Sequence, residues 1–153
     1  MIKLNQLMEM EISYVPSPIQ INEEYEVKSS FAAYSYLITM FNPKAIACQE
    51  EFLVMFLNRS NNIIGIQKLS KGGVHSTVVD KKLIFAAALK SLSSGIILAH
   101  NHPSGNLKPS EQDISITKSI KEAGKLLDIE VLDHIIVSPK HGAYHSMADN
   151  GEL

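Results

Sequence analysis

A short stretch near residue 100 carries three side chains that bind metals well. His100 and His102 lie two positions apart at the end of an apolar run, so an extended chain would point both imidazoles to the same side. After a turn at Pro103-Ser104-Gly105 the chain reaches Ser110 and then Asp113. Imidazole and carboxylate groups are common protein ligands of zinc. The spacing therefore predicts a zinc site made by the two histidines and the aspartate.

The number of ligands indicates what this metal would do. Catalytic zinc sites use three protein ligands and keep the fourth position for water, whereas structural sites are closed by four. The chain has one cysteine, Cys48, which excludes a cage of several thiolates and any intrachain disulfide. Zinc lowers the pKa of a bound water from about 15.7 to about 7 and polarises a carbonyl. The sequence thus predicts hydrolysis of a carbonyl compound, with a general base still to be found.

Each of these residues also has a reading without catalysis. An arbitrary His-x-His pair is more often a pair of solvated loop histidines. Ser110 and Asp113 form a Ser-x-x-Asp pattern that is close to a helix capping box. Capping and chemistry are compatible for Ser110. Asp113 precedes Ile116 and Ile120 by one and two helical turns, so its carboxylate would share the apolar face that packs toward the histidines.

The apolar patterns predict the elements that position these residues. Residues 1–30 are turn-rich and are expected to form an arm with one short strand near Glu11–Val15. Asp80 is expected to cap the helix over residues 81–93. The remaining predicted elements are a helix over 30–40, strands over 52–57, 63–69 and 74–79 as an antiparallel meander, a strand over 96–99, a helix over 110–127, and strands over 130–137 and 144–147.

Composition limits the class of protein. A chain of 153 residues with 45% hydrophobic residues is large enough for one core, and we expect a single domain. The formal net charge of −2 does not indicate nucleic-acid binding, although a local basic patch remains open. Nowhere are there 18 consecutive apolar residues. We therefore expect a soluble, cytoplasmic protein without membrane association.

Residues 100–113 resemble the JAMM motif of the MPN-type metallopeptidases, which reads His-x-His, seven residues, Ser, two residues, Asp. The form His-Asn-His-Pro-Ser-Gly is similar to the bacterial RadC branch in particular, and the resemblance extends over about residues 31–153. It implies an α/β fold: a mixed, largely antiparallel sheet sandwiched by helices, MPN/JAMM-like and cytidine-deaminase-like. Longer RadC proteins have an N-terminal helix-hairpin-helix part associated with DNA, which we do not expect in the 30 residues before the resemblance.

The resemblance also implies a role for each site residue. His100, His102 and Asp113 would hold Zn²⁺, and Ser110 would stabilise the oxyanion. The residues alone offer two bases, Glu50 and Glu51, at the edge of the first buried strand. The resemblance selects Glu51, which would take a proton from the zinc-bound water and return it to the leaving amine. The implied substrate is a peptide or isopeptide bond in a protein or peptide.

Some alternatives stay open at this level. Asp133 and His134 alternate along one predicted strand, so at most one of them faces the metal, either as a partner of a ligating histidine or as a satisfied core residue. A DNA-associated accessory domain, linked to repair or mobile elements, is the rival function. An inert scaffold is a third reading, and it is disfavoured because no ligand is missing. The sequence leaves the oligomeric state open.

Overall fold

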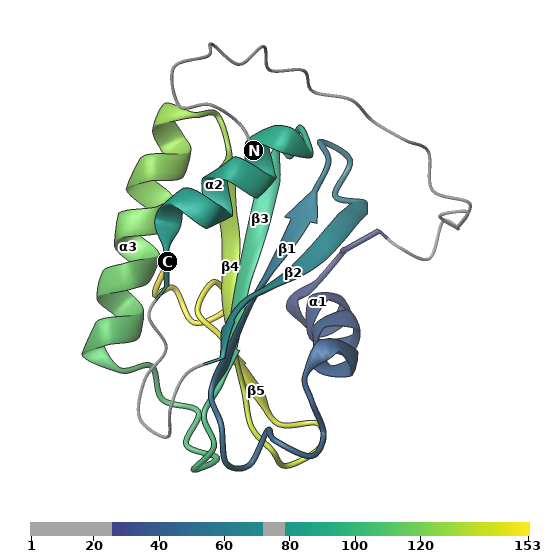
Figure 1. Cartoon of the computed structure of the whole chain (residues 1–153), viewed down its shortest axis with the longest axis vertical. Helices are drawn as coiled ribbons and strands as arrows, with labels where there is room; N and C mark the ends of the chain where they lie inside the picture. The colour runs from purple at the N-terminus through teal and green to yellow at the C-terminus, as the bar shows by residue number, and fades with distance from the viewer. Residues whose placement is uncertain (1–25, 72–78) are drawn as a thin grey trace, which may run out of the picture.

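The computed structural model describes residues 26–71 and 79–153, which form a five-stranded sheet with helices on both faces (Figure 1). The strands are β1 (Glu51–Leu57), β2 (Ile63–Lys71), β3 (Gly95–Asn101), β4 (Glu130–Val137) and β5 (Tyr144–Ser146). The helices are α1 (Ser30–Leu37), α2 (Lys81–Lys90) and α3 (Glu111–Leu126), and a 3-10 turn, Ile38–Met40, follows α1. The expected mixed α/β fold is confirmed.

The strand order is β2-β1-β3-β4-β5. Neighbouring strands pair antiparallel except β3 and β4, which are parallel. Helix α3 makes the crossover that a parallel pair requires. Every residue of β1 and β3 is buried, because helices cover both sides of these central strands. The near-continuous apolar run in β1 is the sequence signature of this position.

Alternation along the strands divides the core into two halves. Leu53, Met55 and Leu57 point to the side covered by α1, which we call the α1 face. The intervening residues of β1 point to the side covered by α2 and α3, which we call the α2–α3 face. A side chain on one face cannot meet a side chain on the other, because the sheet lies between them. This division decides which residues meet at the end of β3.

Local signals explain where the helices begin. Ser29 caps α1 by accepting a hydrogen bond from the Ala32 N–H, and Asp80 caps α2 through the Lys82 N–H. The end of α3 packs so closely that a Cβ built on Gly124 would lie 2.3 Å from the Ile129 carbonyl oxygen. Only glycine allows this approach between α3 and the turn into β4.

Most predicted elements are present with shifted ends. The helix predicted over 81–93 ends at Lys90, and the strand predicted over 144–147 ends at Ser146. The first two strands of the predicted meander pair antiparallel, as expected. Most of the third, over 74–79, lies outside the described residues, as does the strand expected near Glu11–Val15. Within the described ranges no helix has the length and apolarity to cross a bilayer.

Candidate metal centre

The predicted ligands meet where β3 ends on the α2–α3 face. His100 pairs across the sheet with Phe52, and the two rings stack with an interplanar angle of 10°. His102 follows β3 directly, and its backbone N–H donates to the Val137 carbonyl. Asp113 lies in the first turn of α3, which brings its carboxylate over the end of the strand. The end of β3 and the first turn of α3 therefore contribute to one site.

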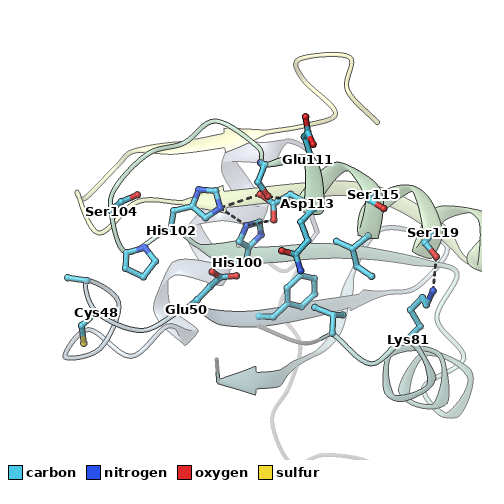
Figure 2. Close-up of a pocket in the computed structure, with 17 residues that line it drawn as sticks. Cys48, Glu50, Lys81, His100, His102, Ser104, Glu111, Asp113, Ser115 and Ser119 are labelled. Atoms are coloured by element: carbon cyan, nitrogen blue, oxygen red, sulfur yellow. Dashed lines mark hydrogen bonds and ion pairs between the residues drawn. The ribbon is translucent and has the colours of Figure 1, made fainter. Parts of the chain in front are cut away.

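The ligand atoms are close together (Figure 2). His100 Nε2 lies 2.9 Å from His102 Nε2. Asp113 Oδ1 lies 3.1 Å from His100 Nε2, and Asp113 Oδ2 lies 3.3 Å from His102 Nε2. Among the described residues, these three side chains form the cluster of His, Cys, Asp and Glu groups that is able to hold a metal ion. The structure thus brings together the three residues predicted as metal ligands.

The other nitrogen of His102 is held by the backbone. His102 Nδ1 lies 2.6 Å from the carbonyl oxygen of Asn106. A carbonyl oxygen only accepts hydrogen bonds, so Nδ1 carries the proton and donates it. In the neutral ring, Nε2 is then left with a bare lone pair directed at Asp113 and His100.

A buried relay fixes His100 in the same tautomer. Thr117 Oγ1 donates to the Asp113 carbonyl, so it accepts a proton from His134 Nδ1, 2.5 Å away. His134 Nε2 is therefore bare and accepts from His100 Nδ1 at 2.8 Å. His100 Nε2 is left without a proton, like that of His102. Of the two residues that could support a ligating histidine, His134 is the one that binds His100. Asp133 faces the other way and accepts from the Ser146 hydroxyl and the Ala148 N–H.

The electrostatics of the site favour a cation. Burial and the neighbouring His100 both lower the pKa of His134 well below its ordinary 6.5, so this ring is neutral. Asp113 accepts a hydrogen bond from His102 when that ring is protonated, and this raises the pKa of His102 despite its burial. Burial works to raise the pKa of Asp113, but the hydrogen bonds that His100 and His102 donate in their protonated forms hold it well below its ordinary 3.8. Two bare nitrogens and an ionised carboxylate that point at one spot need a positive charge between them, and this nitrogen and oxygen donor set suits zinc.

Ser110 caps α3 and completes a capping box. Its Oγ accepts from the Asp113 N–H at 3.1 Å, and Asp113 Oδ2 accepts from the Ser110 N–H at 2.7 Å. The cap reading of this pair is therefore confirmed. The bond from the Ser110 N–H orients the Asp113 carboxylate toward the histidines, so capping and ligand geometry depend on each other.

Glu51 does not belong to this site. Its side chain is fully buried away from the ligands, where Oε1 accepts from Lys68 Nζ and Oε2 from the Asn42 N–H, both at 3.0 Å. Phe52 shares a face with His100, so its neighbour Glu51 points to the α1 face. The choice of Glu51 over Glu50 as the residue beside the metal is therefore wrong.

Glu50 occupies the position that was expected for Glu51. It lines the same cavity as the three ligands, and Figure 2 shows its carboxylate directed toward His100. Its negative charge contributes to the raised pKa of His102. The signal for this was alternation: residues 50 and 52 share a face, and Phe52 is the residue opposite His100.

A cavity of about 1330 Å³ extends from the ligands along α3. Phe52 and Ile116 supply apolar surface, and Ser104, Ser110 and Ser115 supply hydroxyls. Lys81 also lines the cavity, and its Nζ donates to Ser119 Oγ at 2.7 Å (Figure 2).

The RadC-like JAB domain family matches residues 27–152. The chain belongs to this family. Three similar relatives, each called a UPF0758 protein, come from Flavobacterium johnsoniae (50% identical over 102 residues), Porphyromonas gingivalis (50% over 105) and Syntrophomonas wolfei (45% over 89). The aligned parts are 67%, 69% and 58% of this chain, but 44%, 46% and 38% of the relatives. This RadC-like JAB domain therefore spans less than half of each relative's length.

Two residues of the RadC-like site carried no chemical signal in the sequence. Thr117 is one helical turn after Asp113 and is a small hydroxyl residue like the neighbouring serines of α3, yet it anchors the relay behind His100. Asn101 separates the two histidines and faces away from them. Their partners are distant in sequence, so the roles of both residues depend on the tertiary fold.

Proposed function

We propose that this RadC-like JAB domain is a zinc-dependent hydrolase of peptide or isopeptide amide bonds. The observation that carries the proposal is the convergence of two bare histidine nitrogens and the Asp113 carboxylate in an open cavity. A purely structural zinc site would be closed by a fourth protein ligand. Cys48 lines the cavity but is not one of the clustered ligand groups.

His100, His102 and Asp113 would hold the metal. A zinc ion at these ligands supplies a Lewis acid that acidifies water and polarises a carbonyl oxygen. Glu50 is the general base: its carboxylate takes a proton from the attacking water and then gives that proton to the departing amine. One carboxylate serves both steps, so the enzyme returns to its starting protonation state after each cycle.

Ser110 has a free proton for the reaction. Its oxygen accepts the capping hydrogen bond from Asp113, and among the described residues its hydroxyl donates to no acceptor within hydrogen-bond distance. The hydroxyl therefore remains able to donate to the oxygen on which negative charge develops during attack. Capping orients this donor in advance, which makes the two roles of Ser110 complementary.

The test compares the two neighbouring glutamates. Zinc-loaded wild type is incubated with libraries of peptides and of isopeptide-linked lysines, and cleavage is followed by mass spectrometry. Glu50→Gln should keep its zinc and lose activity by about 10²- to 10⁴-fold, the usual contribution of a general base. Glu51→Gln, the matched control, should keep zinc and most of the activity.

Two results would count against the proposal. A zinc-loaded wild type that cleaves neither library would contradict the hydrolase function. A Glu51→Gln variant that folds and is inactive, beside an active Glu50→Gln, would contradict the assignment of the base.

A further inference from the structure

Asn101, between the two histidines, is fully buried and binds the loop that precedes β1. Its Oδ1 accepts from the Glu51 N–H at 2.7 Å. Its Nδ2 donates to the carbonyl oxygens of Ile46 and Gln49, at 2.8 and 2.9 Å. Both protons of the amide group are therefore used, and all three bonds go to backbone atoms of one loop.

Two of these bonds flank Glu50. Gln49 and Glu51 are its immediate neighbours in the chain, and the Asn101 amide holds the carbonyl of the first and the N–H of the second. Asn101 is itself covalently bonded to His100 and His102. A single side chain thus connects the backbone around Glu50 to the strand that carries two of the metal ligands.

The buried Glu51 carboxylate provides a second anchor for the same loop. Its Oε2 accepts from the Asn42 N–H at the start of the loop, and its Oε1 accepts from Lys68 Nζ on the neighbouring strand β2. This anchor is independent of Asn101, so removal of the Asn101 amide should loosen the backbone around Glu50 without releasing the whole loop.

We propose that Asn101 is a positioning residue that fixes the Glu50 carboxylate relative to the metal ligands. The inference rests on the proposed function, in which Glu50 is the base. A general base needs its acceptor atom within about 2.6–3.2 Å of the proton it takes, directly or through one water. A displacement of about 1 Å is enough to cost roughly 10²-fold in rate. An asparagine fits this position because it supplies an acceptor and two donors at once.

The experiment is a double-mutant cycle with Asn101→Ser and Glu50→Gln. Asn101→Ser should lower kcat by about 10- to 100-fold with KM changed less than about 2-fold, because a misplaced base slows the chemical step. Zinc affinity, measured by competition with a chelator, should stay within about 3-fold of wild type. In the Glu50→Gln background the same substitution should have almost no further effect on kcat.

The matched control is Asn58→Ser. Asn58 Oδ1 also accepts from two backbone N–H groups, those of Ser60 and Asn62, but in the turn between β1 and β2. The Asn58→Ser variant should lose a comparable number of hydrogen bonds while its kcat stays at the wild-type value. The inference would be overturned if Asn101→Ser lowered kcat as much in the Glu50→Gln background as in the wild type. It would also be overturned if Asn101→Ser lowered zinc affinity as much as kcat.

Amide exchange adds a readout that needs no substrate. The Glu51 N–H should exchange slowly in the wild type and clearly faster in Asn101→Ser, and the Asn101 side-chain protons of the wild type should be protected. Rapid exchange of both in the folded wild type would overturn the inference even if the variant does not fold. If wild type hydrolyses no amide, the proposed function fails; if it does and Asn101→Ser matches its kcat, only the inference fails.

Discussion

Each histidine of the candidate metal centre has one ring nitrogen bound to the protein and one directed into the site. His102 uses the Asn106 carbonyl, and His100 uses the chain through His134 to Thr117. Such partners orient a metal-binding histidine and make it more basic. The relay behind His100 is longer and fully buried, so it holds the ring more rigidly than a contact with solvent would.

Thr117→Val tests this relay. The substitution keeps the shape of the side chain but removes the oxygen that accepts from His134. We expect zinc affinity to fall by about 10- to 100-fold, the usual loss when a partner of a metal-binding histidine is removed. Nitrogen NMR of labelled histidine should show His100 as one tautomer in the wild type, with the proton on Nδ1. In Thr117→Val the same ring should populate both tautomers.

Thr39→Val is the matched control for Thr117. The Thr39 hydroxyl also donates to a backbone carbonyl, that of Tyr36, far from the metal centre. It should leave zinc affinity unchanged. Equal zinc affinities for Thr117→Val and wild type would show that the relay does not support the metal.

At this scale the sequence predicted which three side chains meet, but it placed the wrong glutamate beside them. The two histidines and Asp113 are local in the chain, so spacing and helical periodicity were enough to group them. The choice between Glu50 and Glu51 depends on the register that sets Phe52 opposite His100, a pairing between segments about fifty residues apart. Similarly, nothing in the types of Asn101 and Thr117 distinguishes them from ordinary polar residues.

At the scale of elements, the start of α3 is the part of the fold that matters most to the site. The capping box fixes where the helix begins, and the same two residues face the histidines. The dipole of the helix also favours a negative charge at this end, which supports the ionised Asp113.

Variants of Ser110 separate its cap from its chemistry. Ser110→Ala should cost about 0.5–2 kcal/mol of stability in urea unfolding, because the cap is lost, whereas Ser110→Gly should cost a few tenths. If the hydroxyl also stabilises the oxyanion, both should lower kcat by about 10²- to 10³-fold.

Ser29→Ala is the control, since Ser29 caps α1 away from the site. It should lose stability as Ser110→Ala does and keep its kcat. A Ser110→Gly variant with wild-type kcat would leave Ser110 as a cap alone.

The elements and the antiparallel pairing of β1 with β2 were largely predictable, but the pairing of β3 with β4 was not. The apolar run of β1, the capped start of α2 and the periodicity of α3 are local patterns, which is why their positions agree with the structure. The parallel pairing of β3 with β4 depends on contacts across the crossover. Helix ends shifted by a few residues where backbone hydrogen bonds stopped before the apolar pattern did.

At the scale of the whole molecule, a bound metal would join β3, the loop after it and α3 into one unit. Zinc should therefore raise the melting temperature, since a ligand at 1,000 times its Kd adds about 4 kcal/mol to stability. A chelator should reverse the shift, and His102→Ala should show little shift at all. His145→Ala is the control, because His145 pairs with Glu152 outside the site.

The size of this zinc effect should depend on pH. In the metal-free protein the raised pKa of His102 gives stability that is full below its ordinary 6.5 and is lost as pH rises through the raised value. The lowered pKa of Asp113 gives stability that is full above its ordinary 3.8 and is lost as pH falls toward the lowered value. Since zinc needs a neutral His102, its shift in melting temperature should grow from pH 5.5 to pH 8. A shift that shrinks over this range would contradict the role of His102.

The layered architecture of the described residues follows from features that are visible in the sequence. Buried strands, amphipathic helices and the resemblance to RadC proteins together predicted helices on both sides of a sheet, as observed.

The central claim is a zinc ion on His100, His102 and Asp113, and X-ray absorption of the zinc-loaded protein tests it most directly. We predict about one zinc per chain with four nitrogen or oxygen neighbours at about 2.0–2.2 Å, two of them imidazoles, and loss of the metal in His102→Ala. Absence of stoichiometric zinc, or a Cys48 sulfur at about 2.3 Å from the zinc, would contradict the account.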